Sequence, residues 1–184
     1  IVRVMWKLIA PALDSISEGG VRSVSLMDNA CGSGSLFRFA HPDRHSLFGV
    51  DVDSGPLEAL AKATSDAGFR SEFEVASMAS AQFSGIDVAV LNPPFSIQLE
   101  SPHLLPFEVC THGRFGPATS CLSHVYAVAQ ALDCAQVVAA VLPRTFADSL
   151  KDEATFGPRL RLILDLPRSA FRSEGAEVST SLAI

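Results

Sequence analysis

A short apolar run that stops at an amide and two prolines is the feature that most restricts how this chain can fold. Residues 86–91 are almost all aliphatic, and they lead directly into Asn92, Pro93, Pro94 and Phe95. An apolar run of this kind is typical of a strand covered on both faces, as in a parallel sheet. Pro93 holds Asn92 in an extended conformation, and the two prolines lack N–H donors but keep their carbonyls. The run therefore predicts a buried strand that ends in a rigid, acceptor-rich corner.

Such a corner suits the alkylation of an amino group whose lone pair is delocalised into a ring or a carbonyl. If the side-chain oxygen of Asn92 and the carbonyl of Pro93 each accept one N–H of the amine, they favour a pyramidal nitrogen whose lone pair points at an electrophile. Phe95 would offer a flat face to a planar base, and stacking of this kind contributes about 1–3 kcal/mol. The alternative interpretation is a strand that ends in an ordinary Pro-Pro turn.

The rest of the chain alternates short apolar runs with segments of helical periodicity. Further strands are expected at residues 21–28, 46–50, 73–76, 137–142, 160–166 and 178–184. Helices are expected at residues 2–13, 54–68, 122–134 and about 148–156. The segment 96–119 shows no clear periodicity, and loops of this length inside compact domains usually serve as lids or binding loops. Strands that alternate with helices predict an α/β fold, with a mostly parallel seven-stranded sheet and helices on both faces.

A glycine-rich turn follows the first expected strand. Residues 28–34 read Asp-Asn-Ala-Cys-Gly-Ser-Gly, and Leu36 and Phe37 then begin a helical pattern. A strand, a glycine turn and a helix form the layout of a loop that binds a nucleotide-type cofactor. Phe37 stands where the dinucleotide fingerprint has its third glycine, so a ligand without a pyrophosphate fits better.

Two acids near the tip of the second expected strand compete for the role of ribose ligand. Asp51 and Asp53 both lie about 20 residues after the glycine turn, which is the spacing of an acid that binds a ribose diol. Asp53 also precedes Ser54 and Pro56 at the position of a helix cap. Asp51 is therefore the better candidate for the ribose.

Composition and charge limit the classes of function. The 184 residues are enough for one domain, which we expect to span residues 1–184. The chain begins at Ile1 and not at a methionine, so we expect it to be a fragment of a longer protein. No apolar run reaches the roughly 18 residues of a membrane span and no leader opens the chain, so we expect a cytoplasmic location. The net charge of −6 does not indicate a strong nucleic-acid binder. A local basic rim could still come from Arg144, Lys151, Arg159, Arg161, Arg168 and Arg172.

Four residues could in principle bind zinc, namely Cys110, His112, Cys121 and His124. Zinc sites on loops do combine cysteine and histidine in this way. The spacing of the first pair is unusual, however, and the second pair falls where a helix is expected to begin. We therefore expect free thiols in a reducing compartment and no metal.

Taken in order, these motifs resemble those of the gamma-class adenine-N6 DNA methyltransferases. The matching segments, which span nearly the whole chain, are residues 28–34, Asp51, residues 92–95, residues 141–143 and Phe171. The resemblance implies a Rossmann-like methyltransferase fold and S-adenosylmethionine as cofactor. It also implies DNA as the substrate, modified at the N6 amine of adenine within a restriction-modification or related system.

The resemblance also assigns roles to individual residues. The cofactor would be cradled by Asp28, Ala30, Cys31, Gly32 and Gly34, with its ribose on Asp51. Family members often place an aspartate after the third strand to contact the cofactor adenine. This chain has Ser77 in the matching region, which could still hydrogen-bond the adenine amine.

On the substrate side, the resemblance places Asn92 and Pro93 on the target amine, with Pro94 in the same corner. Phe95 would stack on the base, which must first be flipped out of the duplex at a cost of a few kcal/mol. Phe171 would contact that base from another side, or else would simply pack in the core. The segment 96–117 would then be a lid or a DNA-facing loop.

Other substrates and other roles remain open at this stage. The same corner could serve the glutamine of a translation release factor or a base of ribosomal RNA, although the glutamine enzymes usually carry tyrosine where Phe95 stands. Ser77 and the acidic balance would also suit a non-catalytic module of a larger DNA-processing protein. Only the last expected strand follows Phe171, so we expect target recognition to come from a fused domain or a specificity subunit.

Overall fold

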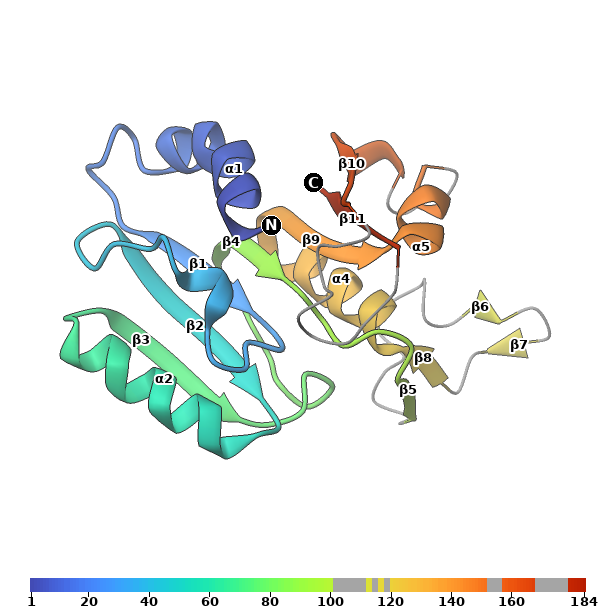
Figure 1. The fold of residues 1–184 in the computed structure, drawn as a ribbon, viewed down its shortest axis with the longest axis horizontal. Coiled ribbons are helices and arrows are strands. Elements are labelled where there is room, and N and C mark those ends of the chain that lie inside the picture. Colours follow the sequence, from blue (N-terminus) through green and yellow to red (C-terminus); the bar gives the residue numbers. More distant parts are fainter. Residues whose placement is uncertain (101–111, 114–115, 118–119, 152–156, 168–178) are drawn as a thin grey trace.

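The computed structural model describes residues 1–100, 112–113, 116–117, 120–151, 157–167 and 179–184 (Figure 1). Its main feature is a seven-stranded sheet in the order β10-β11-β9-β4-β1-β2-β3. The strands are β1 Val24–Asp28, β2 His45–Asp51, β3 Arg70–Val75, β4 Ile86–Leu91, β9 Ala135–Pro143, β10 Ile163–Asp165 and β11 Thr180–Ala183. The strands β3, β2, β1, β4 and β9 run parallel to one another, and β11 runs antiparallel to both β9 and β10. The predicted mostly parallel seven-stranded sheet is confirmed.

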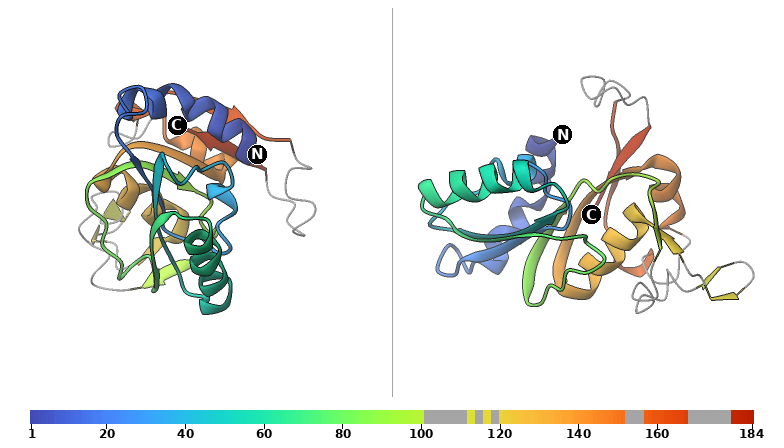
Figure 2. Two further views of the ribbon diagram at one scale, coloured as in Figure 1. Left: turned by 90° about the vertical axis from the view of Figure 1, so that its left-hand side faces the viewer. Right: turned by 90° about the horizontal axis from the view of Figure 1, so that it is seen from below.

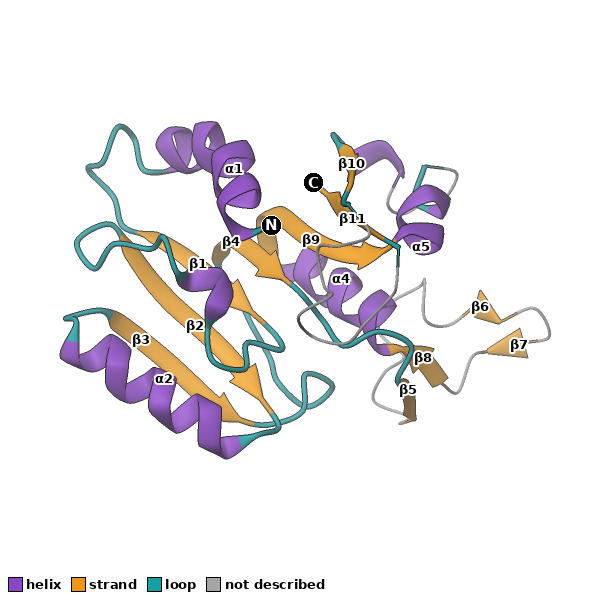
Figure 3. Cartoon of the chain, in the orientation of Figure 1, coloured by secondary structure: helices purple, strands orange, loops and turns teal. Residues whose placement is uncertain are grey.

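Helices cover both faces of this sheet, as predicted (Figure 3). They are α1 Val2–Ile16, α2 Ser54–Asp66, α4 Ser123–Cys134 and α5 Arg144–Ser149. Alternate residues of a strand point to opposite faces, and β4 shows how this divides the core. Val88 and Val90 pack with α1 and α2, whereas Ala89 and Leu91 pack with α4 and α5. Figure 2 shows α2 and α4 on opposite sides of the sheet in its right-hand view.

The central strand β4 behaves as the uninterrupted apolar run predicts. All six of its residues, Ile86–Leu91, are buried, because β1 and β9 flank the strand and helices cover both of its faces. Its neighbours β1 and β9 run parallel to it, so Asn92 leaves the sheet at the same edge as the carboxyl ends of β1 and β2.

Two short antiparallel strand pairs lie outside the main sheet. The strand β5 Gln98–Glu100 pairs with β8 Ser120–Leu122, and β6 His112–Gly113 pairs with β7 Gly116–Pro117. These pairs fall at and within the segment that showed no periodicity in the sequence. Most of the predicted lid, including residues 101–111, lies outside the described residues.

The structure corrects two predicted helices. The helix expected to open at Leu36 is only a single 3-10 turn, Ser35–Phe37. The amide of Ala40 donates to the carbonyl of Phe37 at 2.8 Å, a bond over three residues that replaces the four-residue spacing of an α-helix, and the carbonyl of Leu36 accepts the indole Nε1 of Trp6 at 2.8 Å.

The helix expected at residues 148–156 instead begins directly after β9, as α5 Arg144–Ser149. Pro143 immediately precedes it, and a proline with its fixed φ suits the entry to a helix. Residues 152–156 lie outside the described part of the chain.

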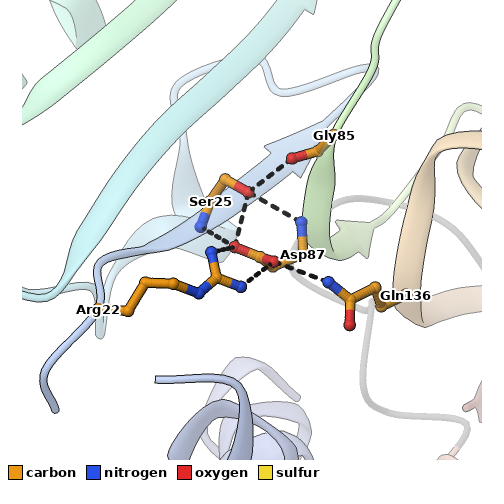
Figure 4. A network of polar contacts seen from close by, with 5 residues as sticks. All are labelled: Arg22, Ser25, Gly85, Asp87 and Gln136. Atoms are coloured by element: carbon orange, nitrogen blue, oxygen red, sulfur yellow. Dashed lines mark hydrogen bonds and ion pairs between the residues drawn. The ribbon is translucent and has the colours of Figure 1, made fainter. Parts of the chain in front are cut away.

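A polar network ties together the amino ends of three parallel strands (Figure 4). The carboxylate of Asp87 in β4 accepts two hydrogen bonds from Arg22, at 2.6 and 3.0 Å, and one from the amide of Gln136 in β9 at 2.9 Å. It also accepts from the backbone N–H and the hydroxyl of Ser25 in β1. Burial favours the neutral acid, but the hydrogen bonds from Arg22 and Ser25 outweigh it, so the pKa of Asp87 is lowered.

None of the helices within the described ranges is long and apolar enough to cross a membrane.

Candidate functional site

The carboxyl ends of β1, β2 and β4 meet at the point where the strand order reverses. From β1 the chain continues to β2 and β3 on one side, and then returns to place β4 and β9 on the other side. In open α/β sheets, ligands bind beyond the carboxyl ends of the strands at such a switch point. A cleft of about 490 Å³ opens there.

The cleft is lined by two groups of residues from different parts of the chain. The loops after β1, β2 and β3 contribute Asn29, Ala30, Asp51, Val52, Ala76, Ser77 and Met78. The segment after β4 and the start of α4 contribute Asn92, Pro94, Ile97, Leu99 and Ser123. The fold thus brings the predicted residues Ala30, Asp51, Ser77, Asn92 and Pro94 into one cavity.

Asp51 is held in place by the glycine turn. Its Oδ2 accepts the N–H of Gly32 at 2.7 Å, and its Oδ1 accepts the N–H of Asp53 at 3.0 Å. Gly32 and Gly34 both have positive φ, of 50° and 75°. A Cβ at Gly34 would also collide with the side chain of Leu60 in α2, so this position needs glycine.

The two competing acids have separate roles. The Oδ1 of Asp53 accepts the N–H of Gly55 at 3.1 Å and caps the amino end of α2, which is the capping role considered for it in the sequence. Asp51 lines the cleft. The predicted binding of a ribose by Asp51 stays a prediction.

Asp28 lies buried at the end of β1. Burial raises its pKa to about 7, opposed by the hydrogen bond from the N–H of Ala30 and reinforced by the charge of Asp51. A carboxyl group with this pKa is partly protonated near neutral pH, and a cation bound nearby would favour its ionised form.

The thiol of Cys31 is buried beside the glycine turn. It packs so closely against β2 that a Cβ on Gly49 would lie 2.8 Å from its Sγ. Burial raises the pKa of this thiol to about 12, so it stays protonated at neutral pH. Its backbone N–H donates to Val50 at 3.0 Å and fastens the turn to β2.

Ser77 lines the cleft just after β3. Its Oγ accepts the N–H of Ala79 at 3.2 Å. A hydroxyl has two acceptor lone pairs and one hydrogen, so Ser77 keeps one lone pair and its hydrogen for a ligand.

Sequence reasoning missed a buried amide pair that links the cleft to α4. Gln130 donates through Nε2 to the carbonyls of Met78 and Ala81, at 2.9 and 3.0 Å, so its Oε1 must be the acceptor. Asn29 donates through Nδ2 to that Oε1 at 2.9 Å and to the carbonyl of Ala127 at 3.1 Å. The Oδ1 of Asn29 is buried and has no hydrogen-bond partner among the described residues.

The predicted corner emerges from β4 with Pro93 buried and Asn92 partly exposed in the cleft. Within the described residues, the carboxamide of Asn92 makes no hydrogen bond. The carbonyl of Pro94 accepts from the Oγ of Ser123, and the Nδ1 of His124 accepts the N–H of Ser96 at 3.2 Å. Sequence analysis did not connect Ser123 or His124 with the corner; the only signal was two polar residues where an otherwise apolar helix begins.

Several predicted residues cannot be placed in the cleft. Phe171 and Cys110 lie outside the described residues, as does the side chain of His112. His124 is engaged with the corner. Among the residues whose placement is described, no group of three or more His, Cys, Asp or Glu side chains could hold a metal ion.

Comparison with solved structures identifies the fold. A Listeria monocytogenes protein assigned to the class I S-adenosylmethionine-dependent methyltransferases superposes with a TM-score of 0.65, at 17% identity over 96% of this chain. A dimethyladenosine transferase from Plasmodium falciparum gives 0.57, at 13% identity over 93% of this chain. A tRNA (uracil-54, C5)-methyltransferase from Pyrococcus abyssi, solved with S-adenosyl-L-homocysteine, gives 0.52, at 18% identity over 93% of this chain.

This chain covers 57%, 59% and 36% of those three chains, respectively. No protein-family model and no curated sequence matches it. The chain has the Rossmann-like fold of these methyltransferases, which confirms the predicted fold.

Proposed function

We propose that this chain is the catalytic domain of an S-adenosylmethionine-dependent methyltransferase that acts on the N6 amine of adenine in DNA. One observation carries the proposal: Asn92, with a carboxamide unpaired among the described residues, lines the same cleft as Asp51. The corner would bind the acceptor amine, and the loops after β1, β2 and β3 would bind the cofactor.

The residues of the cleft fit this cofactor. The Asp51 carboxylate, oriented by two backbone N–H groups, suits the hydroxyls of a ribose. Val52 is 73% exposed beside it and offers an apolar surface to an adenine ring. The hydroxyl of Ser77 can still donate a hydrogen bond to a ligand. The buried Oδ1 of Asn29, which has no partner among the described residues, could accept a hydrogen bond from the cofactor.

When bound, S-adenosylmethionine would supply a methyl group on a positively charged sulfur. The acceptor nitrogen would form the new bond to the methyl carbon, the sulfur would keep the electron pair of the broken bond, and the nitrogen would then release a proton to water. Asn92 and the carbonyl of Pro93 would accept the two N–H groups of the acceptor amine and stabilise the charge that develops on it. Phe95 would stack against the base. Methyl transfer needs alignment and a dry site more than a strong base, and the buried Pro93 supports such a site.

A base amine in RNA is the second candidate acceptor. The Pyrococcus abyssi tRNA methyltransferase has a similar fold, and an Asn-Pro-Pro-Phe corner could hold the amine of an adenine in either nucleic acid. A carboxamide acceptor such as the glutamine of a release factor is also compatible with the corner.

Transfer from methyl-labelled cofactor to matched DNA, RNA and glutamine peptide substrates tests the proposal. We expect N6-methyladenine in DNA by mass spectrometry. Asn92→Ala should lower turnover at least a hundredfold with cofactor affinity nearly unchanged, because the carboxamide acts as charge develops. Gln82→Ala, which removes an exposed carboxamide outside the cleft, is the matched control. Label only in RNA or peptide, or full turnover by Asn92→Ala, would overturn the assignment.

We further propose that a fused domain or partner subunit supplies target recognition. The net charge of −6 provides little affinity for phosphates, and specific binding needs both backbone and base-edge contacts. Sequencing of the methylated positions should find weak, unselective modification by residues 1–184 alone. Efficient modification at one defined site would contradict this expectation.

A further inference from the structure

The first two residues of α4 hold the backbone that follows Asn92. The β5–β8 ladder returns the chain to the corner, and the N–H of Ser123 then donates to the carbonyl of Ile97 at 2.8 Å. The Oγ of Ser123 accepts the N–H of Ile97 at 3.3 Å and donates to the carbonyl of Pro94. Ser123 has no exposed surface, so water cannot readily replace these bonds.

His124 holds the residues between those two contacts. Its Nδ1 accepts the N–H of Ser96 at 3.2 Å, so the ring hydrogen resides on Nε2. The imidazole lies edge-on between two aromatic rings, 6.2 Å from Phe95 and 5.1 Å from Phe146. It is 3% exposed, and burial lowers its pKa, which keeps it in the neutral form that this acceptor role requires.

The backbone conformation of Ser96 is one that only contacts with surrounding residues can stabilise. Its φ of 59° is left-handed, which costs a residue with a side chain roughly 1 kcal/mol or more. Such a conformation persists only where surrounding contacts determine it. Within the described part of the chain, Ser123 and His124 make hydrogen bonds to this backbone at Pro94, Ser96 and Ile97.

We propose that Ser123 and His124 are positioning residues for the acceptor half of the site. They hold the backbone from Pro94 to Ile97 in one conformation, and His124 packs edge-on against the ring of Phe95. The inference deepens the proposed function, since it identifies what sets the orientation of the ring that would stack on the acceptor base.

The same helix also reaches the cofactor half. Further along α4, Gln130 and the carbonyl of Ala127 hold Asn29, and Gln130 also holds the carbonyl of Met78. One rigid element therefore sets the positions of both groups of cleft residues. Loss of the contacts at its first turn should disturb the acceptor half and leave the cofactor half in place.

Amide hydrogen exchange, followed by NMR, tests this without any substrate. His124→Ala should speed the exchange of the Ser96 amide at least tenfold, and His124→Asn should recover part of the protection because its side-chain oxygen can accept the same bond. Asp133→Ala, an exposed site near the end of α4, is the control and should match wild type. If His124→Ala unfolds the domain, His124→Phe keeps a ring and removes only the acceptor. Unchanged exchange at Ser96 in the folded variants would overturn the proposal.

Turnover provides the second readout. His124→Ala and Ser123→Ala should lower kcat at least tenfold, with Kd for S-adenosylmethionine within twofold of wild type and partial rescue by His124→Asn. Faster exchange with wild-type kcat would show that the contacts do not position the acceptor, and would overturn the proposal. If wild type methylates no acceptor at all, the proposed function fails, and the exchange data alone decide whether these residues position the corner.

Discussion

Asp28→Asn should reverse its effect on stability between acidic and alkaline pH. The pKa of Asp28 rises from 3.8 to about 7, first because of burial, against a hydrogen bond from Ala30 and together with repulsion from Asp51. The folded chain therefore binds this proton more tightly than the unfolded chain. The stability contributed by the protonated acid is complete below about pH 4 and is lost as the pH rises through about 7. At about 1.4 kcal/mol per pKa unit, the loss amounts to about 4 kcal/mol.

The asparagine variant avoids that loss but introduces another cost. Its Oδ1 can still accept the N–H of Ala30, at 3.1 Å in the wild type, and it never ionises. Its buried NH₂ group would need new acceptors, and leaving it unsatisfied costs about 1–3 kcal/mol. We therefore expect the variant to be less stable than wild type at about pH 4, where little of that stability has been lost, and more stable at about pH 8.

Urea unfolding of both proteins across this pH range measures the difference in free energy of unfolding. Asp53→Asn is the matched control, because Asp53 is exposed and asparagine caps a helix equally well. The same measurement on Asp53→Asn shows how far replacing an exposed carboxylate by an amide changes the free energy of unfolding across this pH range. A difference between wild type and Asp28→Asn that stays constant would refute the reasoning, because it would mean that Asp28 titrates alike in the folded and unfolded chain.

Three further outcomes are expected. Asp51→Ala should weaken S-adenosylmethionine binding at least tenfold by calorimetry, whereas Asp53→Ala should keep the affinity and lose about 1 kcal/mol of stability with its helix cap; equal affinity of wild type and Asp51→Ala would contradict the ribose assignment. Asp87→Ala should lower the free energy of unfolding by about 3 kcal/mol, because the buried groups that donate to Asp87 lose their acceptor and the half-exposed Arg22 loses its ion-pair partner. Because the pKa of Asp87 is lowered in the folded chain, the greater stability of wild type over Asp87→Ala is present above about pH 4 and should decrease as the pH falls through the folded pKa. A stability difference that increases on acidification would contradict this expectation. Phe95→Ala should raise KM for the acceptor about tenfold or more through lost stacking, with cofactor Kd unchanged, and an unaltered KM would exclude Phe95 as the base platform.

The sequence alone predicted those elements that depend on residues close together along the chain. The uninterrupted apolar run of β4 predicted a strand buried on both faces, and all six of its residues are buried. The spacing of Asp53 from the start of α2 predicted a helix cap, and the cap is present. Capping and strand burial depend on neighbours along the chain or on the pattern within one element, so a single sequence can reveal them.

Only the tertiary structure decided which residues surround the cleft and how some elements end. The helix predicted after the glycine turn is a single 3-10 turn hydrogen-bonded to Trp6, 30 residues away, and Asn29 is oriented by Gln130, 101 residues away. His124 accepts a hydrogen bond from Ser96, 28 residues earlier in the chain and just after the corner that Asn92 begins. These contacts arise because parallel strands bring their carboxyl ends to one edge of the sheet, and because buried polar groups then pair with whichever partners the packing places beside them. The periodicity of a sequence does not indicate such pairings, so the contacts of Ser123, His124 and Gln130 could be found only in the folded chain.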